Sequence, residues 1–150
     1  MIKMKEMIIS KPDTEMENMY QPYDTDAGYD LRALEGSGII LPFQTKIVKA
    51  NVRAQIPKGY HLEIIGRSGL SSKGILVHRG TIDPGYTGII GVIMTNLKLR
   101  PVRFKKGERI AQMIIAKHEK PELVELSEPE FEVASASDRG GKGFGHSGTE

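Results

Sequence analysis

The sequence predicts an all-β fold, a sandwich or barrel of short strands. Apolar and polar residues alternate in short segments such as Tyr60–Ile65, and turn-forming residues interrupt these segments at the roughly 8–12-residue spacing of such folds. No segment has the long 3.6-residue apolar repeat of a helical domain. The 150 residues include no cysteine but suffice for one core without disulfides. We therefore expect one domain over residues 1–136, followed by a tail over 137–150.

The expected strands follow one another along the chain, separated by turns rich in glycine and proline. Residues 10–25 are polar and are expected to form a loop. Within 45–56 the apolar alternation includes Ile47, Val52, Ala54 and Ile56. The strands are expected at residues 2–9, 29–33, 39–41, 45–56, 60–65, 75–77, 89–96, 101–104, 109–116 and 122–126. The segment between 119 and 132 is acidic and is expected to form a solvated surface linker.

The charge balance argues against stable nucleic-acid binding. Lysine and arginine number 21 and aspartate and glutamate 19, so the formal net charge is +2, whereas binding to a polynucleotide depends on clustered positive charge. The first nine residues interleave charged with apolar side chains, and no long apolar span follows, so we expect neither a secretion signal nor a membrane segment. We expect a soluble, cytoplasmic protein in which any phosphate chemistry comes from a local site.

Asp83 stands at the end of a strand, in a run of turn formers. Pro84 and Gly85 favour a tight turn, because proline presets φ and glycine accepts positive φ without a steric clash. An isolated aspartate before such a turn most often has a structural role, since its carboxylate caps backbone amides. A functional role for Asp83 therefore depends on the other segments.

Two earlier segments carry charged or polar groups that could belong to a site. Asp30 and Arg32 share one face of the strand 29–33, where an exposed ion pair would be worth about 0–1 kcal/mol. Residues 66–74 include three glycines, three serines, one arginine and one lysine, whose amide, hydroxyl and cationic groups can converge on a phosphate. Ser68 could open a short helical turn there, although a plain polar loop would have the same composition.

Gln112 and the glycine-rich tail complete the candidate residues. Gln112 interrupts an apolar strand, and a buried amide without a partner costs about 1–3 kcal/mol, so it is either a ligand contact or exposed on an edge strand. The tail is rich in glycine, which disfavours regular structure. It nevertheless carries Arg139, Lys142, Phe144 and His146, which suit phosphate binding and stacking on a base. We expect a flexible lid that orders on a ligand.

Five segments, in order and across most of the chain, resemble the five motifs of the trimeric dUTPases, the dUTP nucleotidohydrolases. Each motif is short, but five in order are highly specific. The segments are Ala27–Leu31; Gly66–Leu70; Gly80–Asp83 with Tyr86–Gly88; Gly107–Gln112; and Arg139–Gly140 with Gly143–Gly148.

The resemblance implies a distorted jelly-roll β-sandwich or barrel with a flexible glycine-rich C-terminal tail. It implies a homotrimer with shared active sites, in which the tail closes over a neighbouring subunit's site. It further implies Mg²⁺-assisted hydrolysis of dUTP to dUMP and pyrophosphate, which limits uracil incorporation into DNA and supplies dUMP for thymidylate synthesis.

The resemblance also implies roles for individual residues. Asp83 is expected to activate the water that attacks the α-phosphorus, and Asp30 to hold Mg²⁺ through a coordinated water, with support from Arg32. Tyr86 is expected to pack on the deoxyribose and Phe144 to stack on uracil. The full set of expected substrate contacts is Arg67, Ser68, Gly69, Thr81, Ile82, Tyr86, Gln112, Arg139, Phe144, Gly145, His146 and Ser147.

One segment departs from the family pattern. Many members have an asparagine and a longer hairpin ahead of the catalytic aspartate, whereas Leu76–Thr81 is about two residues shorter. A tight hairpin there would still exclude the thymine methyl group by its shape and offer backbone groups to uracil.

Two other functions remain open. The dCTP deaminases share the fold and several motifs, but they activate water with a glutamate, and neither Glu63 nor Glu108 falls where that glutamate is expected. The second alternative is a nucleotide-sensing or protein-binding module on the same scaffold. A regulatory protein partner is expected if the chain comes from a phage.

Overall fold

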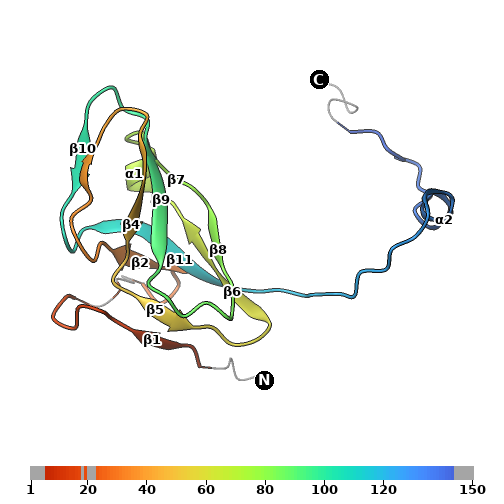
Figure 1. Ribbon diagram of the computed structural model, residues 1–150, viewed down its shortest axis with the longest axis horizontal. Helices are drawn as coiled ribbons and strands as arrows, with labels where there is room; N and C mark the ends of the chain where they lie inside the picture. The colour runs from red at the N-terminus through yellow and green to blue at the C-terminus, as the bar shows by residue number, and fades with distance from the viewer. Residues whose placement is uncertain (1–5, 18, 20–22, 144–150) are drawn as a thin grey trace. The chain divides into compact units, whose positions relative to one another are not determined.

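The computed structural model describes residues 6–17, 19 and 23–143 (Figure 1). The chain divides into two compact units, Met1–Glu119 and Lys120–Glu150. All strands of the described residues lie in the first unit, together with a one-turn helix, and the second unit contains one short helix. The predicted all-β fold class is therefore confirmed, as a mostly β structure with little helix. The domain boundary expected between residues 136 and 137 stays a prediction.

The larger sheet has four antiparallel strands in the order β2-β11-β6-β8. Its inner face is apolar, because alternate residues such as Leu31, Leu62 and Ile64 are buried while their neighbours along the strand are more exposed. The strands are β2 (Gly28–Arg32), β11 (Arg109–Lys117), β6 (Tyr60–Ile65) and β8 (Gly80–Ile82).

The second sheet has three antiparallel strands in the order β4-β9-β7. Val48, Val77, Val92 and Met94 are buried, and they belong to the same core cluster as the inner residues of the larger sheet. The two sheets therefore pack face to face around one core, as the alternation predicts. The strands are β4 (Thr45–Lys49), β9 (Gly91–Asn96) and β7 (Ile75–Val77).

Two short strand pairs and two helices complete the described structure. Strand β1 pairs with β5 and β3 pairs with β10, both antiparallel. No helix in the described part of the chain is long and apolar enough to cross a membrane. The bounds are β1 (Ile8–Ser10), β5 (Arg53–Gln55), β3 (Gly38–Ile40), β10 (Val102–Phe104), α1 (Ser68–Ser71) and α2 (Glu128–Ala134).

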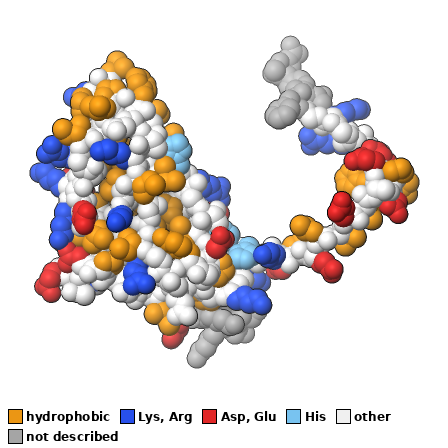
Figure 2. Space-filling model, viewed as in Figure 1, with side chains coloured by type: hydrophobic (Ala, Val, Ile, Leu, Met, Phe, Trp, Pro, Cys, Tyr) orange, Lys and Arg blue, Asp and Glu red, His pale blue; other side chains and the backbone are white. Residues whose placement is uncertain are grey.

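The segment predicted as one strand over 45–56 is two strands, and Ile47 was placed in the wrong phase. The buried hydrophobic side chains occupy even positions from Val48 to Ile56, whereas Ile47 is 69% exposed. Ile47 pairs with Ile93 on the outer face of the β4-β9-β7 sheet. Figure 2 shows hydrophobic side chains at the surface of the face that carries β9, interspersed with lysine and arginine.

The segment before Asp83 is a crossover between sheets rather than a hairpin. Strand β7 pairs with β9, whereas β8 pairs with β6 in the other sheet. Only His78 and Arg79 connect the two strands. Gly80 begins β8 and lies opposite Ile64. The short connection therefore carries the chain from one layer of the sandwich to the other.

The strand expected at residues 122–126 is wrong, and a helix follows instead. These residues have no strand partner in the described structure, and an alternating segment cannot form a ladder without one. Helix α2 begins after Ser127, which forms a capping box with Glu130. The hydrogen bonds from Ser127 lower the pKa of Glu130. Ser127 and Glu130 were the available sequence signal for this helix.

Asn96 ties three segments together beside the core. Its side chain is 1% exposed. The amide nitrogen donates to the carbonyl oxygens of Ile40 (3.1 Å) and Arg100 (2.9 Å), and the amide oxygen accepts from the backbone nitrogen of Lys98 (2.9 Å). One side chain thereby fixes the turn after β9 and the end of β3.

We expect Asn96→Ala to lower the free energy of unfolding by about 1–3 kcal/mol, because it leaves buried backbone groups without their partner. Urea unfolding at fixed protein concentration measures the change. Asn96→Asp keeps the acceptor for Lys98 but loses the two donated bonds, so it should also destabilise the protein. Wild-type stability in both variants would contradict this role.

Candidate functional site

Strand register brings residues from three separate motifs to one end of the larger sheet. Asp30 on β2 lies opposite Gln112 on β11, and Gln112 lies opposite Ile65 on β6. Arg67 follows two residues after Ile65, at the start of α1. Gly28 permits the close approach of β2 to β11, since a Cβ there would lie 3.2 Å from the carbonyl oxygen of Met113.

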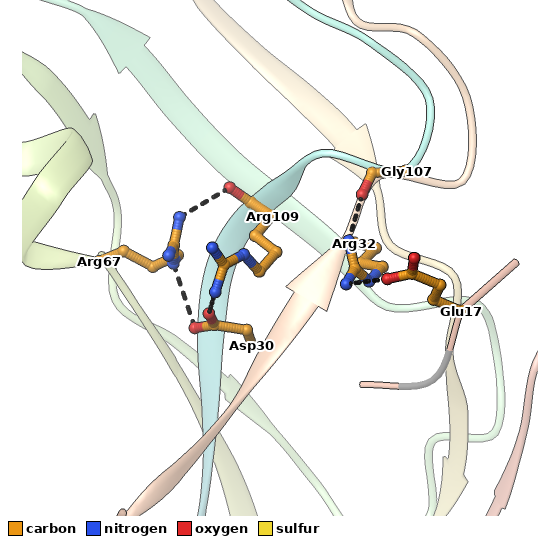
Figure 3. A network of polar contacts seen from close by, with 6 residues as sticks. All are labelled: Glu17, Asp30, Arg32, Arg67, Gly107 and Arg109. Carbon is orange, nitrogen blue, oxygen red and sulfur yellow. Dashed lines mark hydrogen bonds and ion pairs between the residues drawn. The ribbon is translucent and has the colours of Figure 1, made fainter. Parts of the chain in front are cut away.

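Asp30 is the centre of this group and is held by two arginines (Figure 3). Its side chain is 8% exposed; one carboxylate oxygen accepts from Arg67 Nε and the other from Arg109 Nη1, both at 3.1 Å. Arg67 Nη1 also donates to the backbone carbonyl of Arg109 at 3.2 Å. The two guanidinium groups around this carboxylate offer several charged N–H donors, a donor set that suits an anionic ligand.

A cavity of about 360 Å³ lies over this group. Asp30, Arg67 and Gln112, which were predicted as site residues, all line it. Gln112 is partly exposed to the cavity rather than buried in the core, which favours its expected role as a ligand contact. The other lining residues are Asp26, Ala27, Gly28 and Arg109.

The predicted helical turn at Ser68 is confirmed. Arg67 is the N-cap residue of α1, and its carbonyl oxygen accepts from the amides of Leu70 and Ser71 at 3.0 and 2.9 Å. Ser68 and Gly69 are exposed in the first turn, where backbone N–H groups lack partners within a helix. These amides and the Ser68 hydroxyl are available to a ligand beside Arg67.

Arg32, on the same strand as Asp30, joins β2 to neighbouring segments. Its Nη1 donates to the carbonyl oxygen of Gly107 at 2.9 Å, and its Nη2 pairs with Glu17 (Figure 3). These contacts link β2 to the turn that precedes β11. The support that Arg32 was expected to give the Asp30 group stays a prediction.

Asp83 lies on an exposed loop directly after β8. The predicted turn is present, since the amide of Tyr86 donates to the carbonyl oxygen of Asp83 at 3.0 Å. The Tyr86 hydroxyl donates to the carbonyl oxygen of Ile89 at 2.9 Å. The ring lies directly over Gly88, where a Cβ would come within 2.6 Å of the ring carbon that bears the hydroxyl. Gly88 therefore makes room for the ring.

Two contacts outside the predicted motifs hold this region. Arg53 Nε on β5 donates to the carbonyl oxygen of Thr87 at 2.8 Å, so β5 braces the Asp83 loop. Glu63 lies opposite Thr81 across β6 and β8, and it pairs with Arg79. Hydrogen bonds from Arg79 and then from His61 lower the pKa of Glu63.

The Asp30 group and the Asp83 loop lie toward opposite ends of β6. Asp30 and Gln112 are level with Ile65, whereas Ile82, the residue before Asp83, pairs with Leu62. Three residues of strand separate these two levels, about 10 Å at roughly 3.3 Å per residue. The predicted site residues of one chain therefore form two separate groups.

The tail residues belong to the second unit. Arg139 Nε donates to the carbonyl oxygen of Lys142 at 3.0 Å, and both residues are exposed. The predicted contacts Phe144, Gly145, His146 and Ser147 lie outside the described residues. Among the described residues, no group of three or more histidine, aspartate or glutamate side chains is arranged to hold a metal ion.

Sequence reasoning missed the roles of Arg109 and Arg53. Arg109 stands within a predicted motif, but its ion pair with Asp30 depends on the pairing of β11 with β2, which a single sequence does not reveal. Arg53 was counted only as part of a strand. Nothing in the sequence pattern indicates that it reaches the loop after Asp83.

Comparison with known proteins places this geometry in context. The dUTPase family model matches residues 14–148. A deoxyuridine 5'-triphosphate nucleotidohydrolase of Finegoldia magna is 38% identical over 151 residues, covering 97% of this chain and 99% of that protein. The corresponding protein of Chlamydia trachomatis serovar L2 is 40% identical over 126 residues, covering 81% and 84%.

A solved structure supports the same assignment of the fold. The dUTPase of Staphylococcus bacteriophage 80alpha with dUpNHpp matches with a TM-score of 0.85 and 31% identity, covering 97% of this chain and 99% of that one. That structure is described in connection with phage dUTPases that control transfer of virulence genes by a G protein-like mechanism.

We expect Gly88→Ala to displace the Tyr86 ring, because the added Cβ would overlap it. The ring resonances of Tyr86 in NMR spectra, assigned with Tyr86→Phe, report the displacement. Gly85→Ala is the matched control, since a Cβ at Gly85 meets no atom within 4 Å. Unchanged Tyr86 shifts in Gly88→Ala would contradict the packing described above.

Proposed function

Because the chain belongs to the dUTPase family and is a dUTP diphosphatase, we propose that it hydrolyses dUTP to dUMP and pyrophosphate by in-line attack of a water on the α-phosphorus. Asp83 is the general base that orients and deprotonates this water. The observation that carries the proposal is the cavity in which Asp30, Arg67 and Gln112 from three motifs meet, with Arg67 and Arg109 as cationic donors. The reaction limits uracil incorporation into DNA and supplies dUMP for thymidylate synthesis.

The cavity at the Asp30 group, which we call the phosphate cavity, binds the triphosphate. Arg67 donates charge-assisted hydrogen bonds, the amides of Ser68 and Gly69 add uncharged donors, and Gln112 contacts the same chain of phosphates. Phosphoryl transfer depends mainly on positioning and on compensation of negative charge. The two guanidinium groups around Asp30 supply that charge before the substrate arrives.

The dUTPase family uses Mg²⁺, and the residues present fit this ion in one particular way. Asp30 is already engaged by two arginines, so it suits contact through a coordinated water rather than a direct bond. Mg²⁺ commonly keeps several waters and takes its other ligands from substrate phosphates. When bound, the ion neutralises charge on the triphosphate; Arg67 and Gln112 orient the phosphate chain from the protein side.

The Asp83 loop binds the nucleoside end of the substrate. Tyr86, fixed over Gly88 and hydrogen-bonded to Ile89, packs on the deoxyribose and disfavours a 2′-hydroxyl. Thr81 and Ile82, at the end of β8, lie beside the base. Since β7 crosses to the other sheet directly before β8, backbone groups of this short crossover select uracil by shape.

A homotrimer joins the two halves of the site. Within one chain the phosphate cavity and the Asp83 loop lie toward opposite ends of β6, so a neighbouring copy provides the Asp83 loop that faces each phosphate cavity. The exposed Ile47, Leu76 and Ile93 on the outer face of the β4-β9-β7 sheet provide apolar surface for such contacts. The tail then closes the site, with Arg139, His146 and Ser147 on phosphates and Phe144 and Gly145 at uracil.

A regulatory protein partner is a second proposal, favoured by one comparison. The phage relative with a TM-score of 0.85 is described in connection with control of virulence gene transfer. Such a role would be added to hydrolysis, since Asp83, Arg67 and Gln112 are all present in this chain.

Product analysis tests the proposed reaction. Purified protein with Mg²⁺ is offered dUTP, dCTP, dTTP and UTP separately, and nucleotide, base and pyrophosphate are resolved. We expect dUMP and pyrophosphate from dUTP alone. Ammonia released from dCTP would show a deaminase instead, and the absence of any turnover would leave a binding module.

We expect Asp83→Asn to lower kcat by about 10²–10⁴-fold, because it removes the general base. Affinity for dUpNHpp should change little, since the amide retains the size of the carboxylate. Glu35→Gln, at an exposed turn, is the matched control for loss of a carboxylate. An equal loss of affinity and rate in Asp83→Asn would indicate a structural role for Asp83.

Removal of residues 137–150 should abolish most turnover while the thermal midpoint and assembly state stay unchanged, because the lid acts only on bound substrate. Steady-state kinetics and light scattering measure the two effects. Hydrolysis at the full rate by the truncated chain would refute the lid.

A further inference from the structure

A second cavity adjoins the phosphate cavity and shares two of its arginines. It has a volume of about 770 Å³, more than twice the 360 Å³ of the phosphate cavity, and Arg67 and Arg109 line both. We call it the basic hollow. Six cationic side chains line it, Arg32, Arg67, Arg103, Lys105, Lys106 and Arg109, against two carboxylates, Glu17 and Glu108.

Part of this positive charge is compensated by neighbouring acids. Arg32 pairs with Glu17, and Lys106 pairs with Asp13. The hydrogen bond from Lys106 holds the pKa of the Asp13 carboxyl below its usual range, so this acid is ionised at neutral pH. Arg32 and Lys106 are therefore each paired with a carboxylate.

Arg103 and Lys105 are the groups that remain for a ligand. Both side chains are exposed on the rim of the hollow, and neither has an ion-pair partner among the described residues. Glu108 is directed to the backbone, since its carboxylate accepts from the amide of Lys105 at 2.9 Å. An anion in the hollow would thus meet two uncompensated cations, with Arg67 and Arg109 behind them.

We propose that the basic hollow is a second anion site, distinct from the substrate phosphates, and that its ligand is pyrophosphate. The proposal rests on the proposed function, because hydrolysis of dUTP releases this anion beside Arg67. Pyrophosphate carries several negative charges in a compact volume, which matches closely spaced cations better than a single phosphate does. The hollow is open to solvent, so its affinity falls as salt rises.

Occupation of the hollow inhibits hydrolysis through the shared arginines. Arg67 and Arg109 hold Asp30 at 3.1 Å each, and an anion in the hollow attracts the same two guanidinium groups away from that carboxylate. The phosphate cavity then still binds substrate but no longer holds the triphosphate in the geometry needed for attack on the α-phosphorus. Because the two anions occupy different cavities, excess dUTP does not fully relieve the inhibition.

Calorimetric titration with pyrophosphate tests the site, with Mg²⁺ held constant and the substrate sites saturated by dUpNHpp. Wild-type protein is expected to bind one further pyrophosphate per chain. Arg103→Ser combined with Lys105→Ser should weaken this binding at least tenfold. Lys58→Ser combined with Arg100→Ser removes the same charge from exposed positions outside the hollow and should leave it unchanged.

Inhibition kinetics provide the second readout. In wild type, pyrophosphate should lower kcat at saturating dUTP, and the Arg103→Ser/Lys105→Ser variant should lose this effect while its uninhibited kcat and thermal midpoint stay at wild-type values. Purely competitive inhibition, equal weakening in the control variant, or equally tight binding of sulfate or inorganic phosphate would each overturn the proposal. Failure of wild type to hydrolyse dUTP would overturn the proposed function. The calorimetric titration would still test the pyrophosphate site in that case.

Discussion

The pairing of β11 with both β2 and β6 is the constraint on which the site depends. It places Asp30, Gln112 and Ile65 in one row across three strands, and Arg67 enters from the turn that follows. A shift of one residue in this register would turn Asp30 and Gln112 to the other face of the sheet. The buried inner face resists such a shift, because Leu31, Ile64 and Met113 would then leave the core. Core packing thereby fixes the position of the polar groups.

The electrostatics of Asp30 explain why the row is built around an acid although the proposed ligand is anionic. Two guanidinium groups in close proximity repel each other, and the carboxylate between them lowers that cost. Removing one partner from a largely buried charge group costs more than the pair contributes. The acid therefore organises these cations whether or not a metal ion is bound, and it holds the two arginines, Arg67 and Arg109, that line both the phosphate cavity and the basic hollow.

The sequence predicted the elements that depend on a local pattern. It did not predict the contacts that depend on the pairing of segments far apart in the chain. Alternation identified β6, β9 and β11 within one or two residues, and glycine with serine indicated the turn of α1. The phase of Ile47 was wrong because the neighbouring odd and even positions are both apolar there, and burial is decided by the facing sheet. The pairing of Arg109 with Asp30 and of Arg53 with Thr87 depends on strand partners, which one sequence does not specify. The motifs indicated which residues are candidates for the site. That these residues lie in two groups toward opposite ends of β6 follows only from the three-dimensional structure.

The separation of the two half-sites along β6 has a genetic consequence. In the proposed assembly each copy gives its phosphate cavity to one site and its Asp83 loop to another, so a defect in one half leaves the other half of that copy usable. Two inactive alleles, one altered at Arg67 and one at Asp83, would complement each other when expressed together, because mixed assemblies contain some sites built only from intact halves. A single defective allele expressed with an intact one would likewise reduce activity in proportion to the fraction of defective copies, without abolishing it.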